Sequence, residues 1–317
     1  MATTANITTS YAGEDAKKWV SAALLEGNTL AKQLITIMPN VKYKAVMHRL
    51  DLGGGLVDST CDFAAAGSYT LTERYLQPKR LKLNKNLCKN DFADTWQAIE
   101  QGYSAHDVLP KSFADYLLAL QVASVAEEIE TYIWQGSAAV SGQFDGFCTL
   151  LALDADLPTA NEVAGTTVDA TNVIVELGKL VDAIPQRLYG KQDAVIFVSA
   201  NIHRAYIRAL GGFGAAGLGA AGVDNKGTQW YNGAPLYFDN FRLELANGMP
   251  ADTMIFSLKS NLFFGTGLVS DESEAKVIDM SPLDGSDNVR IVMKMTAGVN
   301  YAVVQDVCTY GIVNAAN

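Results

Sequence analysis

The apolar positions of this chain follow helical spacing in some segments and strand-like patterns in others. Helical spacing predicts helices at residues 15–37, 107–134, 171–184 and 199–210. Alternating or continuous apolar runs predict strands at residues 41–52, 69–76, 80–83, 194–198, 235–238 and 253–258, with three short strands in the last quarter. The mixture indicates an α+β fold.

The longest predicted helix has an apolar stripe that changes face. Asp107 fits its N-cap, and Pro110 is tolerated in its first turn. One set of apolar residues shares one side of the helix: Phe113, Tyr116, Leu117 and Leu120. A second set, which continues to the end of the helix, clusters on the opposite side: Leu118, Val122, Val125, Ile129, Tyr132 and Ile133. Such a helix is expected to be a spine that packs against different elements at its two ends.

The segment before this helix holds few bulky apolar residues. Gly53-Gly54-Gly55 ends one predicted strand, and Ala64-Ala65-Ala66-Gly67 precedes the next. A two-stranded excursion of this composition is marginal in water by itself. We therefore expect it to lie on another surface.

The later segments divide into two kinds. Residues 150–265 alternate helix and strand, whereas residues 88–135 and 270–317 supply the long helix and a β-meander. The α/β lobe is therefore expected to be inserted into the other lobe. Residues 1–12 are small and polar and predict a mobile arm.

The composition indicates a folded protein of a reducing compartment. With 317 residues and 49% hydrophobic content, the chain is long enough to bury a full core. Its cysteines, Cys61, Cys88, Cys148 and Cys308, form no Cys-x-x-Cys pair, which argues against a zinc knuckle or a disulfide framework. No apolar run approaches the roughly 20 residues of a membrane span, and the N-terminus lacks the order of a signal peptide. We expect a soluble, cytoplasmic product.

The net charge of −10 is unevenly distributed. Residues 1–110 carry 12 basic and 11 acidic residues, whereas residues 111–317 carry 12 and 23. This balance argues against a nucleic-acid-binding module, which needs a basic stripe. One basic strip does occur, without any acidic residue, at Arg74, Lys79, Arg80, Lys82, Lys85 and Lys89. It is either a solvated strand face or a docking strip for an acidic surface.

Two glycine-rich strings match the dinucleotide-binding fingerprint. They overlap in one segment and contain Gly212, Gly214, Gly217, Gly219 and Gly222. A phosphate-binding turn must follow a strand and open a helix, whereas here a helix precedes the glycines. The segment is therefore interpreted as a surface loop without a cofactor.

The remaining polar residues form no recognisable catalytic or metal-binding pattern. His48, His106 and His203 occupy separate segments and lack partners at metal-ligand spacing. Glu127, Glu128 and Glu130 on the long helix lack the histidine of a carboxylate metal motif, so they are interpreted as a solvated or partner-facing charge patch. No catalytic, cofactor or metal site is predicted.

Several strings resemble the major capsid proteins of tailed bacteriophages. They cover nearly the whole chain and include Leu71-Thr-Glu-Arg-Tyr-Leu-Gln-Pro-Lys-Arg-Leu, Tyr132-Ile-Trp-Gln-Gly, Gly142-Gln-Phe-Asp-Gly-Phe, Lys259-Ser-Asn-Leu-Phe-Phe-Gly-Thr-Gly-Leu and Thr296-Ala-Gly-Val. The order of the predicted segments resembles the same family.

The resemblance implies the Hong Kong-type phage capsid fold, which encapsulins share. It divides the chain into an N-terminal arm and helix (1–48), an extended two-stranded loop (49–87), a peripheral domain with the spine helix (88–149), an α/β axial domain (150–268) and a returning β-meander of the peripheral domain (269–317).

The function that the resemblance implies is structural and not enzymatic. Copies would self-assemble as pentamers and hexamers into the icosahedral shell of a virion, made in the host cytoplasm, around double-stranded DNA that is held without sequence specificity. Portal and scaffolding proteins, and in some relatives decoration proteins, would be partners. The alternatives are an encapsulin-type cargo compartment and, from another class, a nucleotide-dependent enzyme.

The same resemblance suggests which residues meet between copies. The strip of Arg74, Lys79, Arg80 and Lys82 is expected to contact an acidic patch of a neighbour, formed by Glu127, Glu128 and Glu130 or by Asp271, Glu272 and Glu274. Gly212, Gly214, Gly217 and Gly219 are expected to form a loop near the capsomer axis.

Overall fold

The structure is a computed structural model that describes residues 9–12, 28–54, 56, 58–59, 61, 66–88, 111–210, 235–267 and 274–316. The α-helices of these residues are α2 (Asn28–Ala31), α4 (Lys111–Gln135), α5 (Phe147–Ala152), α6 (Val173–Asp182), α7 (Ala200–Leu210) and α8 (Ser281–Asp284). Short 3₁₀ turns lie at Thr159–Asn161, Gln186–Leu188, Lys259–Asn261 and Val304–Asp306.

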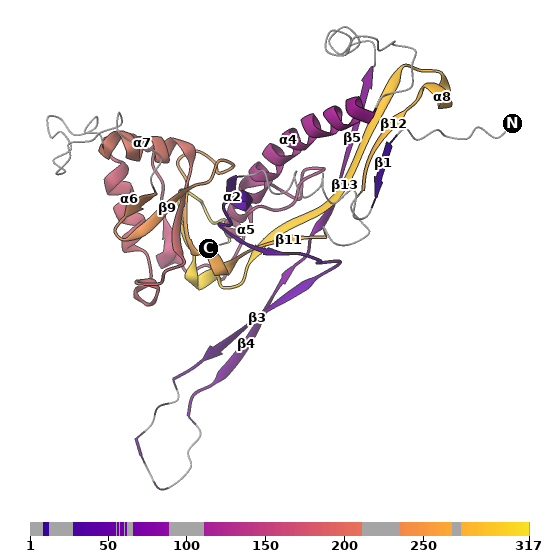
Figure 1. Cartoon of the computed structure of the whole chain (residues 1–317). Helices are drawn as coiled ribbons and strands as arrows, with labels where there is room; N and C mark the ends of the chain where they lie inside the picture. The colour runs from indigo at the N-terminus through magenta and orange to yellow at the C-terminus, as the bar shows by residue number, and fades with distance from the viewer. Residues whose placement is uncertain are drawn as a thin grey trace.

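The strands form three sheets (Figure 1). The long sheet has the order β1 (Thr9–Ala12), β12 (Glu274–Asp279), β13 (Asn288–Tyr301), β11 (Leu262–Thr266) and β2 (Thr36–Met38), with β5 (Lys79–Cys88) also paired to β13. The α/β sheet has the order β6 (Glu162–Val163), β14 (Cys308–Tyr310), β10 (Met254–Leu258), β7 (Ala194–Val198), β9 (Phe241–Leu245) and β8 (Leu236–Phe238). The hairpin pairs β3 (Ala45–Leu52) with β4 (Tyr69–Leu76) and projects from the body.

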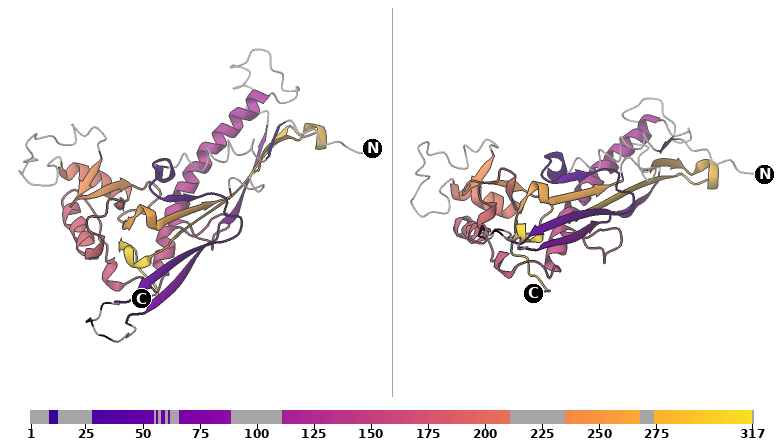
Figure 2. Two further views of the ribbon diagram at one scale, coloured as in Figure 1. Left: turned by 60° about the horizontal axis from the view of Figure 1, so that its bottom comes forward. Right: turned by 90° about the horizontal axis from the view of Figure 1, so that it is seen from below.

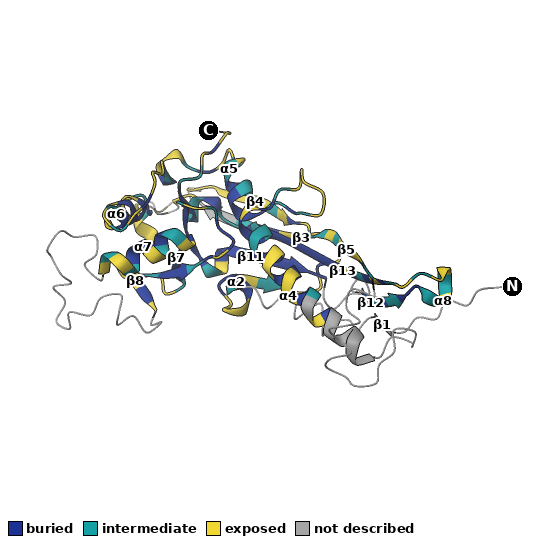
Figure 3. Ribbon diagram, turned by 90° about the horizontal axis from the view of Figure 1, so that it is seen from above, coloured by how far each residue is buried: buried dark blue, intermediate teal, exposed yellow. Residues whose placement is uncertain are grey.

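Strand β13 is the centre of the long sheet and forms because its sequence alternates. Val289, Ile291, Met293 and Met295 are buried, whereas Arg290 and Lys294, which alternate with them, are exposed. The buried side faces α4, whose residues Val122, Val125, Ile129 and Ile133 share one apolar cluster with it. Beyond Met295 both sides of the strand are buried (Figure 3), because the turn between β4 and β5 covers the side that faces away from α4.

The two lobes share one apolar core. Trp134, near the end of α4, packs its ring against Phe147 of α5 and Phe197 of β7, with centroid distances of 5.5 and 5.0 Å. The cluster that contains these rings also includes the long sheet and one face of the α/β sheet. A second cluster lies on the other face of the α/β sheet, which α6 and α7 cover (Figure 2). The lobes are therefore joined by a continuous hydrophobic contact.

A buried polar lock ties α2 to the end of α4. Thr29 donates its backbone N–H to Glu130 Oε2 at 3.0 Å and its hydroxyl to Glu130 Oε1 at 2.5 Å. Trp134 Nε1 donates to Thr29 Oγ1 at 3.0 Å. A buried carboxylate requires such partners, since an unpaired charge in the core is costly.

Most of the predicted elements are present. The strands 69–76 and 194–198 match β4 and β7, and the predicted helix 199–210 differs from α7 by one residue at its start. The later apolar stripe of the long helix is confirmed, because Leu118, Val122, Val125, Ile129 and Ile133 are all buried. The residues of its earlier stripe, Phe113, Tyr116, Leu117 and Leu120, have side chains outside the described part.

The bounds of two predicted helices were wrong. The helix predicted over residues 15–37 does not continue to its end, because Thr36–Met38 pairs with β11 as a parallel strand. Residues 13–27 lie outside the described part. Helix α6 begins after Asn172 and not at Thr171. The backbone N–H groups of Thr171 and Asn172 instead donate to Asp169 Oδ1.

Strand β5 extends from Lys79 to Cys88, although only residues 80–83 were predicted. It is longer because β13 provides a partner along its whole length.

The sheets also divide the chain differently from the expected boundary at residue 268. Strand β11, on the α/β side of that boundary, pairs with β13 of the long sheet. Strand β14, on the other side, pairs with β10 and β6 in the α/β sheet. The chain thus crosses between the lobes near each of these strands.

The polar lock gives a test of the shared core. Replacing Thr29 by Val keeps the side-chain shape but removes the hydroxyl that Glu130 and Trp134 both use. We expect the free energy of unfolding to fall by about 2–4 kcal/mol, because hydrogen bonds to a buried carboxylate are among the stronger ones.

Urea denaturation followed by tryptophan fluorescence measures the change. Thr131→Val is the matched control, since the Thr131 hydroxyl only donates to the carbonyl of Glu127 in its own helix. Equal stability of the two variants would show that the lock contributes nothing.

Candidate functional site at the base of the hairpin

A close backbone crossing fixes where the hairpin leaves the body. Gly265 of β11 and Gly298 of β13 are direct partners in the long sheet. The turn between β4 and β5 passes over this pair, so that a Cβ atom at Gly298 would lie 3.0 Å from the Cα atom of Pro78. A Cβ atom at Gly265 would lie 2.8 Å from the Leu76 side chain. Glycine at both positions therefore permits the turn to pack directly on the sheet.

The hairpin has two different faces because its strands pair in strict antiparallel register. Residues that lie opposite each other share a face. One face carries the pairs Ala45–Leu76, Met47–Arg74 and Arg49–Thr72, and the other carries Val46–Tyr75, His48–Glu73, Leu50–Leu71 and Leu52–Tyr69. Leu76 and Met47 are buried, so the first face is turned toward the body at the base of the hairpin.

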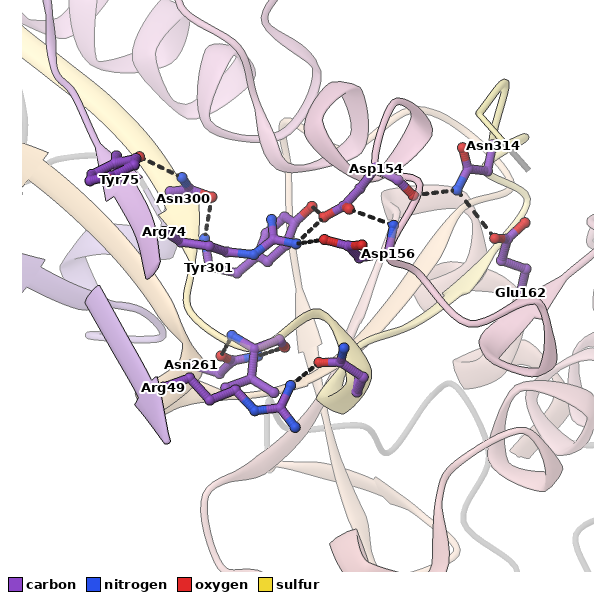
Figure 4. A network of polar contacts seen from close by, with 12 residues as sticks. Arg49, Arg74, Tyr75, Asp154, Asp156, Glu162, Asn261, Asn300, Tyr301 and Asn314 are labelled. Atoms are coloured by element: carbon purple, nitrogen blue, oxygen red, sulfur yellow. Dashed lines mark hydrogen bonds and ion pairs between the residues drawn. The ribbon is translucent and has the colours of Figure 1, made fainter. Parts of the chain in front are cut away.

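An ion pair, which we call the latch, attaches this inner face to the body (Figure 4). Arg74 lies 2.6 Å from Asp154 Oδ2, in the loop after α5, and 3.6 Å from Asp156. Tyr301 of β13 donates its hydroxyl to the same Asp154 oxygen at 2.6 Å. The Arg74 guanidinium also lies over the Tyr301 ring, 4.8 Å from its centroid. One carboxylate thus joins the hairpin, the long sheet and the start of the α/β lobe.

Hydrogen bonding determines the charge state of the latch. Burial opposes ionisation of Asp154, but hydrogen bonds from Tyr301, the Asp156 N–H and Arg74 outweigh it and hold the Asp154 pKa below its ordinary value. Burial, with the neighbouring carboxylate, raises the pKa of Tyr301. At neutral pH the latch therefore consists of an ionised Asp154, a neutral Tyr301 and a charged Arg74.

Further contacts support the latch on both sides. Asn300 donates to the backbone oxygen of Tyr75 at 2.8 Å, and Arg49 donates to the side chain of Gln305. The loop that carries Gln305 is held by Asn261, which exchanges two hydrogen bonds with Val303 at 2.7 and 2.8 Å. The base of the hairpin is therefore fixed at several points.

The outer face of the hairpin has no such support among the described residues. It carries Tyr69, Leu71, Tyr75 and Val46, whose side chains are 78%, 58%, 44% and 42% exposed. The pair His48–Glu73, with a distance of 3.4 Å, lies on the same face. An apolar row on a projecting two-stranded ribbon indicates a contact surface for another molecule.

The predicted contact residues do not lie together. Arg74 is in the latch, and Lys79 donates to the backbone oxygen of Ala138 at 3.3 Å. Arg80 and Lys82 are exposed on β5, where the alternation places them on one side of the long sheet. An intermolecular role for this strip remains a prediction.

The acidic residues also differ from one another. Glu127 and Glu128 are exposed on α4, but Glu130 is buried in the polar lock and does not belong to a surface patch. Glu274 is the first residue of β12, and Asp271 and Glu272 lie outside the described residues. The glycine-rich loop with Gly212, Gly214, Gly217 and Gly219 also lies outside them.

The described residues include no cluster of three or more His, Cys, Asp or Glu that suits a metal ion. His48 and His203 lie in different parts of the fold, and burial lowers the pKa of His203. Within the described segments, no helix is both long and apolar enough to span a membrane.

Sequence reasoning did not find the latch. Asp154, Tyr301 and Arg74 are separated by about 80 and 150 residues and belong to no motif. The one available signal was the pair of glycines in the β-patterned last quarter, because glycine inside a strand often marks a close backbone approach.

The latch predicts a dependence of stability on pH. The folded-state pKa of Asp154 is lowered, so its contribution is complete above the ordinary aspartate pKa of about 3.9 and is lost as pH falls through the folded-state value. Asp154→Asn should lower the free energy of unfolding by about 1–3 kcal/mol at pH 7, and the difference from wild type should shrink toward pH 3.

Urea titrations between pH 3 and pH 7 measure this difference. Asp156→Asn is the control, because its carboxylate is exposed and lies farther from Arg74, so its effect should stay below about 1 kcal/mol. A constant difference between Asp154→Asn and wild type at every pH would contradict the assignment.

Comparisons with known proteins identify the fold. No family model and no curated protein sequence matches the chain. Among solved structures it is similar to the capsid of the native GTA particle, with 14% identity over 91% of this chain and 89% of that chain and a TM-score of 0.56. It is also similar to structures from Mycobacterium phage Adephagia (11% identity, 90% and 89%, TM-score 0.56) and Microbacterium phage Oxtober96 (13%, 90% and 90%, 0.54). The chain has the phage capsid fold that its sequence resemblance predicted.

Proposed function

We propose that this protein is the shell-forming protein of a tailed phage, whose copies self-assemble into an icosahedral capsid around double-stranded DNA. The observation that carries the proposal is the hairpin, which is fixed at its base and presents an apolar outer face. The fold shared with capsid structures supports it.

The energetics of the outer face favour association. Fully burying a side chain such as Val46 or Leu71 contributes roughly 1.5–3 kcal/mol, and the aromatic rings of Tyr69 and Tyr75 add further apolar area. These side chains are only partly exposed in the isolated chain, so the gain at one contact is smaller than their sum. In a closed shell the same contact recurs at every boundary between copies, which makes assembly cooperative.

The rigid base gives the hairpin a defined direction. A ribbon that moved freely would lose conformational entropy on binding, whereas the latch and the glycine crossing have already fixed the attached end. The hairpin is thus suited to lie across a neighbouring copy at one angle.

The rest of the proposal follows the fold. Pentamers and hexamers would form around the α/β lobe, with its glycine-rich loop toward the capsomer axis and the long helix at the periphery. Portal and scaffolding proteins are the expected partners, and the protein would reside in the virion after synthesis in the host cytoplasm. The likeness to capsid structures favours neither the cargo compartment nor the nucleotide-dependent enzyme.

Electron microscopy and light scattering of the purified protein test self-assembly. We expect closed shells or capsomers in the wild type. Tyr69→Ser combined with Leu71→Ser should leave a folded chain that assembles at least tenfold less, because the outer face of the hairpin loses most of its apolar surface.

Ile174→Ser combined with Val175→Ser is the matched control. Both residues are well exposed on α6 in the α/β lobe, away from the hairpin (Figure 1). Circular dichroism should be unchanged for all variants. Wild-type protein that stays monomeric at all concentrations, with or without added scaffold, would refute the proposal.

A further inference from the structure

The start of β7 brings three cations together. Lys191 lies just before this strand, and Arg242 of β9 is the direct partner of Val195 in β7. Lys259 follows β10, and its backbone N–H donates to the Asp193 backbone oxygen at 3.0 Å. Because β9 and β10 lie on either side of β7, the backbones of Arg242 and Lys259 are two strand spacings apart, about 10 Å. Long side chains from both can therefore reach one anion.

The three side chains line one cavity, which we call the cationic pocket. Its volume is about 320 Å³, and the charged residues among those that line it are Lys191, Arg242 and Lys259. This volume is at the lower end of the range for small-molecule sites, roughly 300–1,000 Å³. The pocket thus suits a small anion or one group of a larger molecule.

A buried carboxylate holds Arg242 at the pocket. Arg242 Nε lies 2.5 Å from Glu244 Oε1, and the Glu244 side chain is only 5% exposed. A buried carboxylate needs such a cation, because an unpaired charge is costly to bury. The Nη groups of Arg242 make no hydrogen bond to the residues that the structure describes. They remain available as a planar pair of donors.

Lys191 and Lys259 add charge to the pocket without a partner of their own. Neither side chain forms an ion pair or a hydrogen bond within the described part of the chain. Asp193, between the lining residues Gln192 and Ala194, does not line the pocket and accepts a hydrogen bond from Ser260 at 2.5 Å. Gathered positive charges repel one another, so a bound anion is stabilised by all three cations.

Two features favour phosphate over carboxylate as this anion. Three cations exceed the single charge of a carboxylate, whereas a phosphate group carries up to two charges and offers three acceptor oxygens. The second feature is Tyr237, which is 56% exposed and lies opposite Arg242 in the β8–β9 pair. An exposed aromatic ring beside cations is the arrangement on which nucleobases stack.

We propose that the cationic pocket binds a phosphate group, supplied by the backbone of DNA or by a free phosphate compound. Lys191 and Lys259 neutralise its charge, and Arg242 donates two N–H groups to its oxygens. Phosphate contacts carry no sequence information, so DNA held in this way is bound without sequence specificity. The pocket lies within one copy of the chain, and the proposal therefore does not depend on self-assembly.

Two titrations of the full chain test the pocket and distinguish the two sources. Calorimetry with inorganic phosphate measures binding of the free anion, and fluorescence anisotropy with a short labelled DNA duplex measures binding of the backbone. Lys191→Gln combined with Lys259→Gln should weaken binding of the ligand at least tenfold, because phosphate binding depends on charge. Arg242→Lys keeps a cation beside Glu244 but loses the planar pair of donors, so it should weaken binding at least threefold.

Arg204→Gln combined with Arg208→Gln is the matched control. These arginines are exposed on α7 of the same lobe and do not line the pocket, and their loss changes the net charge by the same amount. The affinity of this variant should stay within twofold of wild type. Circular dichroism should be the same for all variants.

The outcomes are distinct. A loss in the double lysine variant with inorganic phosphate alone supports the pocket and identifies a free phosphate compound as its ligand, whereas a loss with the duplex identifies the DNA backbone. The pocket is refuted if wild type binds neither ligand, if the double lysine variant binds as tightly as wild type, or if the control variant loses as much affinity. Shell formation, measured separately by light scattering, is not decided by any of these results.

Discussion

The close passage of the β4–β5 turn over the Gly265–Gly298 pair is the contact on which the arrangement of the hairpin depends. Because no side chain separates the turn from the sheet, β5 can continue directly along β13 while β4 points away from the body. The Arg74–Asp154 latch lies beside this crossing. The glycines determine where the hairpin leaves the body, and the latch then fixes the direction of the hairpin.

The shared core provides a rigid support for the base of the hairpin. Trp134 contacts both α5 and β7, and Asp154 follows α5 after a single residue. The carboxylate that holds the hairpin is therefore positioned by the same packing that joins the two lobes. A displacement of one lobe would move Asp154 relative to Tyr301, so the lobes and the hairpin are mechanically coupled through a few buried side chains.

Much of the fold could be predicted from local pattern, and much of the site could not. Strands β4 and β7 were predicted at their observed bounds because alternation and continuous apolar runs are local signals. The strand Thr36–Met38 was mistaken for helix, since its partner β11 lies more than 200 residues away. Glu130 was interpreted as a surface acid because its hydrogen-bond partner Thr29 lies 101 residues away, on another element. Lys276, Arg290 and Lys294 could not be grouped with the basic strip of β5 until the register was known.

The proposed self-assembly has to overcome the charge of an acidic chain. A net charge of −10 favours solubility and opposes contact between copies. Uniform apolar surfaces would overcome the repulsion but would not select an orientation. The hairpin offers both affinity and orientation, because its outer face is apolar while the latch and the glycine crossing fix its base.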